Sequence, residues 1–134
     1  FTDGGSRGNP GPAAIGVYIE KDGKELAGIG KKIGETTNNV AEYKAVIFGL
    51  KKAKQLIGKK KAKDAVVEVR TDSELLVRQL TGKYKIKQET LCSLFIEIWN
   101  LKQDFTEVNF THIPREENVQ ADRLVNKALD RLDI

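Results

Sequence analysis

The stretch that decides the fold is a candidate β-hairpin at residues 14–33, AIGVYIEKDGKELAGIGKKI. Apolar residues recur in both halves, and the pair Asp22-Gly23 stands between them. An Asp-Gly pair between two apolar runs is a strong hairpin signal, because both residues accept the positive φ angles of a tight turn. Just upstream, residues 1–4 have the pattern of the last part of another strand. We therefore expect three antiparallel strands at the start of the chain.

The remaining sequence alternates helical patterns with two short strand patterns. In chain order we expect a helix over 40–57, a solvated lysine-rich connection at 59–63, a strand over 65–71, a short helix over 73–82, a helix over 89–102, a strand over 106–113 and a helix over 119–132. The core candidates of the 89–102 helix are Leu91, Leu94, Phe95, Ile98, Trp99 and Leu101. The β-branched 65–71 strand follows a helix, which favours a parallel partner. The order βββαβααβα predicts an α/β fold with a mixed five-stranded sheet flanked by helices.

The composition is that of one globular domain: of 134 residues, 40% are hydrophobic and 31% are charged. These values argue against disorder, and the apolar runs fall far short of the ~20 residues that a membrane span needs. A net charge of +4 permits a polyanionic partner without requiring one. The lone cysteine, Cys92, excludes an internal disulfide, and with no recognisable signal peptide it favours a cytoplasmic location. Because the chain has no Met and opens inside a strand pattern, we expect the first strand to be truncated at its N-terminus.

Four acidic residues stand where core residues belong. Asp3 and Asp72 each end an apolar strand pattern, while Glu42 and Asp122 lie on the apolar stripes of two expected helices. Two strand ends and two inward helix faces can converge at one edge of a sheet. Convergent carboxylates repel one another, so their pKa values rise unless cations neutralise them. An all-oxygen set favours Mg²⁺ or Mn²⁺ over Zn²⁺, and a pair of such ions can activate water and stabilise the leaving oxygen of a phosphodiester.

Each carboxylate also has a purely structural explanation. The alternatives are a capping box of Asn39 with Glu42, a helix cap at Thr71 or Asp72, a turn at Asp3-Gly4, and an ion pair of Asp122 with Arg123 or Lys127. Any one of them is a sufficient account of its residue. Four such exceptions in one short domain weaken the structural explanation taken jointly.

The sequence resembles type 1 ribonuclease H over essentially its whole length. Four segments carry the resemblance: FTDGGSRGNPGP at residues 1–12, TTNNVAE at 36–42, TDS at 71–73 and AD at 121–122. Each segment alone is a weak match, but all four in order and at fitting spacings are highly specific. The resemblance implies a single ribonuclease H-like domain over residues 1–134.

The resemblance also implies an activity: metal-dependent hydrolysis of the RNA strand of RNA–DNA hybrids, leaving 5′-phosphate and 3′-hydroxyl ends. It assigns Asp3, Glu42, Asp72 and Asp122 as ligands of two Mg²⁺ ions, for which Mn²⁺ can substitute, and Asp3 as the ligand that bridges both. His112 matches a family histidine that helps proton movement or product departure. The alternative for His112 is a loop histidine bonded to a neighbour.

The resemblance further implies how the substrate is recognised. A hybrid exposes 2′-hydroxyls in a wide minor groove, and amide side chains can bind them as donors and acceptors. Asn9, Asn38 and Asn39 match positions that read this groove, and Thr37 matches one that holds a DNA phosphate. The alternative for these four residues is ordinary turn and cap chemistry. Glu35 departs from relatives with a basic residue there, which puts the strength of the phosphate contact in doubt.

A second departure concerns the basic handle. Some relatives carry a helix rich in Lys, Arg and Trp where this chain has only GKYKIKQ at residues 82–88. The lysines of this segment either touch phosphate or simply face solvent, so we expect modest, salt-sensitive affinity for the hybrid. Two other functions remain open: a catalytically silent hybrid-binding module, and a related nuclease or recombinase domain acting on DNA. The Asn38-Asn39 pair favours the reading of 2′-hydroxyls, and we expect a monomer with no membrane contact.

Overall fold

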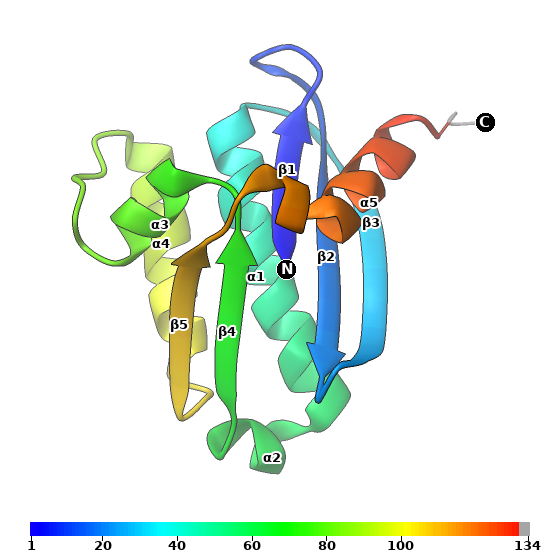
Figure 1. Ribbon diagram of the computed structural model, residues 1–134. Helices are drawn as coiled ribbons and strands as arrows, with labels where there is room; N and C mark the ends of the chain where they lie inside the picture. Colours follow the sequence, from blue (N-terminus) through cyan, green and yellow to red (C-terminus); the bar gives the residue numbers. More distant parts are fainter. Residues whose placement is uncertain (132–134) are drawn as a thin grey trace.

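The computed structural model describes residues 1–131 and has an α/β architecture, as predicted (Figure 1). Its elements are β1 (Thr2–Ser6), β2 (Gly11–Lys21), β3 (Lys24–Thr36), α1 (Asn38–Ile57), α2 (Lys59–Lys63), β4 (Val66–Thr71), α3 (Glu74–Leu80), α4 (Glu89–Lys102), β5 (Glu107–His112), the 3₁₀ turn η1 (Arg115–Glu117) and α5 (Val119–Leu129). Among residues 1–131, no helix is both long and apolar enough to cross a bilayer.

Five strands are present, but their backbone pairing divides them into two sheets instead of the single sheet expected. In the first, β1, β2 and β3 pair in that order and antiparallel; in the second, β4 and β5 pair parallel. β1 and β4 lie side by side where the two sheets meet (Figure 1). β1 has five residues, whereas its neighbour β2 has eleven and continues past it.

The hairpin forms where the Asp-Gly pair predicts it. Asp22 and Gly23 have φ angles of 53° and 78°, so both occupy the left-handed region that the turn requires. The strands on either side are longer than expected, and β3 runs for thirteen residues to Thr36. Its end delivers the chain directly to the start of α1.

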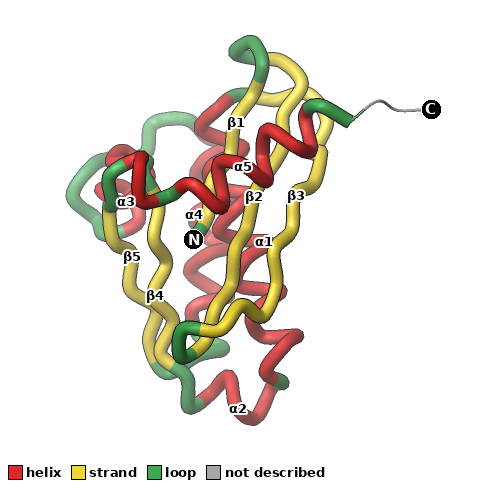
Figure 2. The backbone as a smooth tube through the Cα atoms, turned by 45° about the vertical axis from the view of Figure 1, so that its right-hand side comes forward, coloured by secondary structure: helices red, strands yellow, loops and turns green. Residues whose placement is uncertain are grey.

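Helices cover both faces of the β1–β3 sheet (Figure 2). On one face, the twenty-residue helix α1 packs against β1 and β2, with α4 beside it. Val46 and Leu50, on the predicted stripe of α1, are fully buried in the main core. On the other face, α5 crosses β2, β3 and β1. The sheet is therefore held between two helices that each carry one of the singled-out carboxylates.

Three expectations about the helices need correction. The lysine-rich segment 59–63 is a short helix, α2, and not an irregular connection. The last helix ends at Leu129, and the final residue expected in it, Leu132, lies outside the described residues. On α4, Leu91 and Ile98 are buried, but Trp99 is 53% exposed. One residue beyond Ile98 turns the side chain by about 100° around the helix, away from the core.

Candidate active site

The first of the four carboxylates, Asp3, lies in a row of the sheet that is otherwise glycine. Across the three strands, Asp3 pairs with Gly16, and Gly16 pairs with Gly30. Residues in one such row point to the same face. A Cβ atom on Gly16 would overlap the carbonyl oxygen of Ala121, and one on Gly30 would overlap that of Leu124. The backbone of α5 therefore lies directly on the glycines, on the face to which Asp3 points.

This close approach positions the carboxylate of α5. Asp122 directly follows Ala121, whose carbonyl rests on the glycine row beside Asp3. The ion pairs among residues 1–131 include none with Arg123 or Lys127, so the structural alternative for Asp122 is not observed. The side chain instead interacts with Asn126, whose Nδ2 donates to its Oδ1 at 3.4 Å.

The opposite face of β1 brings in Glu42 by the same device. A Cβ atom on Gly4 would overlap the backbone of Ala41 and Glu42, so α1 also lies directly on the strand. The helix begins at Asn38, and the hydroxyl of Thr37 accepts from the Val40 amide at 3.3 Å. Thr37, rather than Asn39, is therefore the cap, and the capping box that was the structural alternative for Glu42 is not observed. Glu42 is left free to face the end of β1.

Asp72 follows the last residue of β4, Thr71, and enters the site from the second sheet. It does not cap the next helix, because the hydroxyl of Ser73 accepts from the Leu76 amide at 3.3 Å and performs that task. Its Oδ1 accepts a hydrogen bond of 2.9 Å from Nδ2 of Asn118, the residue just before α5. Asp72 is thus held by the same segment that leads to Asp122.

The electrostatics show that the four carboxylates have come together. Burial, followed by the charges of Asp72 and Asp122, raises the pKa of Asp3 from 3.8 to about 7; the Gly4 amide, which donates to Asp3 Oδ1 at 3.0 Å, opposes this. Burial and the charges of Asp3 and Asp72 raise the pKa of Glu42 well above its usual value. Both carboxylates therefore favour the protonated form unless a cation neutralises them.

This cluster fits a hard divalent cation. Its donors are all carboxylate oxygens, and the buried Oε2 of Glu42 has no hydrogen-bond partner within the protein. Among residues 1–131, no three acidic, His or Cys side chains are close enough to coordinate one ion in the conformations that they adopt here. Like charges repel, and a cation is what draws such a set together. The four residues can therefore hold Mg²⁺ or Mn²⁺ and so bring a Lewis acid to a phosphodiester.

His112 is the last residue of β5, where it pairs with Thr71 in the parallel register of β4. Parallel strands bring their carboxyl ends to one edge, so His112 and Asp72 emerge from the same end of the second sheet. Its side chain is exposed and makes no hydrogen bond with the described residues, so the neighbour-bonded alternative is not observed. The imidazole of His112 is therefore accessible to solvent and to a bound molecule.

The polar residues predicted for substrate recognition lie at the start of α1. Oδ1 of Asn9 accepts from the Asn38 amide at 3.0 Å, and Oδ1 of Asn38 accepts from the amide and hydroxyl of Ser6 at 2.8 and 3.1 Å. These bonds tie the turn after β1 to the helix that carries Glu42. They occupy carbonyl oxygens only, so the NH₂ group of each asparagine stays free to donate. Thr37 uses its hydroxyl as a cap, whereas Asn39 makes no side-chain hydrogen bond within the described residues.

Comparisons with known proteins agree with this geometry. A model of the reverse transcriptase-like family matches residues 1–128. Ribonuclease H of Hydrogenovibrio crunogenus is 32% identical, with the alignment covering 98% of this chain and 94% of that protein. The structure of LC11-RNase H1 in complex with an RNA/DNA hybrid superposes with a TM-score of 0.90 at 51% identity, covering 96% of this chain and 94% of that one.

The chain belongs to the type 1 ribonuclease H family. The α/β fold predicted from the sequence is confirmed by the same match. Some members are longer: a bifunctional protein of Mycobacterium tuberculosis is 42% identical over 96% of this chain, but the chain spans 34% of its length. This ribonuclease H domain therefore corresponds to about a third of the first curated relatives that it matches.

Sequence reasoning missed two kinds of residue in this ribonuclease H site. The glycines that let the helices approach, Gly4 and Gly16, were treated as ordinary turn or strand residues. Gly16 carried a usable signal, since an isolated glycine inside an apolar strand marks a bulge or a close backbone approach. Asn118 carried a weaker one, one helical turn before Asp122 on the same helix face.

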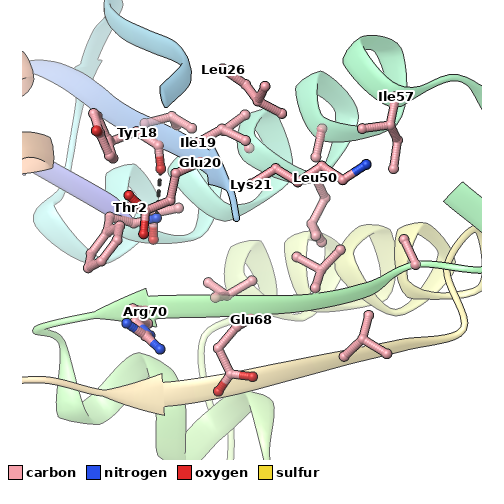
Figure 3. A pocket seen from close by; sticks show the side chains of 18 of the residues that line it. Thr2, Tyr18, Ile19, Glu20, Lys21, Leu26, Leu50, Ile57, Glu68 and Arg70 are labelled. Carbon is pink, nitrogen blue, oxygen red and sulfur yellow. Dashed lines mark hydrogen bonds between the residues drawn. The ribbon is translucent and has the colours of Figure 1, made fainter. Parts of the chain in front are cut away.

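A cavity of about 610 Å³ lies away from the carboxylates of this ribonuclease H domain (Figure 3). One wall is β2 beyond Val17, the other is β4, and Leu50 of α1 projects between them (Figure 3). None of the four carboxylates lines it. We call this cavity the strand groove, because the strand edges that line it pair with no strand across it. β2 pairs with β1 only from Ala13 to Val17, and β4 pairs only with β5.

Proposed function

We propose that this chain is a metal-dependent endonuclease that hydrolyses the RNA strand of RNA–DNA hybrids, leaving 5′-phosphate and 3′-hydroxyl ends. One observation carries the proposal: the buried carboxylates of Asp3 and Glu42 interact with Asp72 and, for Asp3, Asp122, from four different elements. Burial, together with the charges of the neighbouring carboxylates, raises the pKa values of Asp3 and Glu42, and this is costly for the fold unless cations neutralise the cluster. The LC11 relative, described with an RNA/DNA hybrid, supports the substrate class.

Each carboxylate has a role in this proposal. Asp3, Glu42, Asp72 and Asp122 hold two Mg²⁺ ions, with Mn²⁺ as a substitute and Asp3 as the shared ligand. The bound ions supply a water nucleophile at neutral pH and charge stabilisation for the leaving oxygen. Burial of Asp3 and of Oε2 of Glu42 lowers the local dielectric constant and strengthens the attraction of these carboxylates for a cation.

The remaining site residues bind the substrate or move protons. Asn9, Asn38 and Asn39 read 2′-hydroxyls of the hybrid, with the free NH₂ groups of Asn9 and Asn38 as donors. Thr37 holds a DNA phosphate at the N-terminus of α1, where backbone amides point outward. His112 assists proton movement or product departure from the exposed end of β5.

A cleavage assay on an end-labelled RNA–DNA hybrid, with Mg²⁺ and then Mn²⁺, tests the proposal. Cleavage of the RNA strand only, with a 5′-phosphate on the product, is the expected result. Plain duplex DNA of the same sequence is the control, and its cleavage would point instead to a DNA nuclease. Binding of the hybrid without turnover in either metal would identify a catalytically silent binding module.

We extend the proposal to the setting of the domain. The enzyme proposed is a cytoplasmic monomer, and the lone free thiol of Cys92 supports the reducing compartment. Sedimentation of the purified protein, and fractionation of the cells that make it, test the monomer and the location.

A further inference from the structure

One buried amide links three parts of the candidate active site. Asn118 is only 1% exposed, and its Nδ2 donates two hydrogen bonds of 2.9 Å: one to Oδ1 of Asp72 and one to the carbonyl oxygen of Thr2. The backbone carbonyl of the same residue accepts from the Asp122 amide at 3.1 Å. Asn118 therefore contacts one carboxylate ligand through its side chain, another through its backbone, and the residue preceding a third.

The orientation of this amide is fixed by its surroundings. Both NH₂ hydrogens point at acceptors, whereas Oδ1 of Asn118 is buried and has no hydrogen-bond partner within the protein. A flipped amide would place a carbonyl oxygen against the Thr2 carbonyl and the Asp72 carboxylate, and oxygen would face oxygen. Both donor hydrogens of the Asn118 amide are used and its acceptor is not, so the two donated hydrogen bonds determine its orientation. The bond to Asp72 is therefore a specific feature of the site.

We propose that Asn118 is a positioning residue that orients the Asp72 carboxylate for metal binding and keeps it in register with Asp122. The hydrogen bond holds Oδ1 of Asp72 in place, and this sets the direction in which Oδ2 of the same carboxylate points. Because Asn118 caps the start of α5 and its carbonyl oxygen accepts from the Asp122 amide, a movement of that helix shifts the donor to Asp72 together with Asp122. The inference rests on the proposed metal-dependent nuclease activity.

Outer partners of metal ligands act through the ligand's orientation and basicity, and their loss typically costs about 10–100-fold in metal affinity or activity. A merely structural Asn118 would act differently: its removal would loosen the packing of α5 on β1 and lower the melting temperature without changing the dependence on Mg²⁺. The two roles are therefore separated by a metal titration.

The test replaces the amide in Asn118→Ala and, as an isosteric second variant, in Asn118→Asp. Magnesium binding is measured by titration calorimetry on the protein without nucleic acid, and kcat is measured on the hybrid across a series of Mg²⁺ concentrations. We expect half-saturation at Mg²⁺ concentrations about 10–100-fold higher in Asn118→Ala, with kcat partly restored at high Mg²⁺. We expect Asn118→Asp to lose activity, because a carboxylate there repels Asp72.

Asn109→Ala is the matched control. Its Nδ2 also donates to a carboxylate, that of Glu107 at 3.4 Å, but on an exposed part of β5. This variant should bind Mg²⁺ and cleave the hybrid as the wild type does. Because the calorimetric measurement needs no turnover, a wild-type protein that binds Mg²⁺ but does not cleave would refute the proposed function and still test Asn118.

Three results overturn the proposal. The first is an unchanged Mg²⁺ titration in Asn118→Ala, with only the melting temperature lowered. The second, should that variant not fold, is an Asn118→Asp protein that folds and binds Mg²⁺ as tightly as the wild type. The third is a wild-type protein that binds no Mg²⁺ by calorimetry, since there would then be no metal ligand to orient.

Discussion

The boundary between the two sheets has two ends of opposite character. At one end, β1 and β4 bring Asp3 and Asp72 together, and helices rest directly on Gly4 and Gly16. At the other end, beyond Phe1, the strands separate around the strand groove, whose floor is apolar. The first end is tightly packed around carboxylates, whereas the second is hollow, with an apolar floor and with charged side chains such as Glu20, Glu68 and Arg70 in its lining. The proposed metal site lies at the packed end.

This difference teaches that hollowness alone is a poor guide to function in this fold. A large apolar cavity with few convergent polar groups invites a binding-site hypothesis. Here the groove is bordered by strand edges that pair with no strand across it, so it offers backbone hydrogen-bonding groups to an extended segment. The carboxylate end is marked instead by its raised pKa values, which show where the fold bears an electrostatic cost.

The largest expected effect is at the carboxylate end. Asp72→Asn keeps the hydrogen-bonding shape of the side chain but removes its charge, so the protein should fold and bind hybrid while kcat falls about 1000-fold, or ~4 kcal/mol of transition-state stabilisation. Single-turnover cleavage of labelled hybrid and circular dichroism measure the two properties. Full turnover by the folded variant would remove Asp72 from the metal site.

The pH dependence of stability should differ between the metal-free and metal-loaded protein. The pKa of Asp3 is about 7 in the folded state and 3.8 as the ordinary value, so the folded protein binds the proton more tightly. Without metal, the free energy of unfolding should therefore fall as pH rises from about 4 to 7, by a few kcal/mol, since each pKa unit is worth about 1.36 kcal/mol. Glu42 acts in the same direction.

Urea denaturation at a series of pH values measures this slope. Millimolar Mg²⁺ should raise stability most at the upper end of the range, where the carboxylates are ionised and can bind it. Asp3→Asn, which cannot ionise, should flatten the slope of the metal-free protein. An equally steep slope in that variant would place the pH dependence elsewhere in the molecule.

Much of this comparison was predictable from local sequence patterns. The Asp-Gly turn, the stripe containing Val46 and Leu50, and the residues that depart from apolar patterns were sufficient to predict the fold class and to nominate the carboxylates. These signals are local, because periodicity and turn chemistry act over a few residues. The set of four metal ligands stays a prediction, although the charges of its members act on one another in the structure.

The features that could not be predicted depend on contacts distant in sequence. The exposure of Trp99 depends on which face of α4 meets α1, and an apolar helix face does not reveal its partner. The role of Asn118 depends on Thr2 and Asp72, which are 116 and 46 residues away. The cap at Thr37 was missed because three adjacent polar residues all suit the position, and only the backbone path out of β3 selects one.

A smaller effect tests why the carboxylate end is packed so tightly. In Gly16→Ala, the new methyl group meets the Ala121 carbonyl and must push α5 away, so we expect a loss of about 1–3 kcal/mol in stability and weaker Mg²⁺ binding as Asp122 moves. Gly28→Ala, whose Cβ would have only ordinary contacts on β3, is the matched control and should change neither property. Denaturation curves and calorimetry measure both. Equal effects in the two variants would show that strand propensity, and not the approach of α5, determines the cost.

The smallest expected effect is at the groove end. Phe1 and Tyr18 already exchange backbone hydrogen bonds of 2.8 and 2.9 Å, so a strand added ahead of Phe1 enters the groove in register with β2. Thr2 faces α1 beside Gly49, so alternation makes the first and third residues ahead of Phe1 face the apolar floor.

An extension of four residues with valine at these two positions and threonine at the others should raise the melting temperature by a few degrees, since about 1 kcal/mol moves it by ~2–4 °C in a domain of this size. The matched control exchanges valine and threonine, which keeps the composition but turns valine away from the groove. A Gly-Ser extension of equal length measures the effect of length alone. Equal melting temperatures for the three proteins would mean that the groove is not a seat for a strand, and the contrast between the two ends would then need another cause.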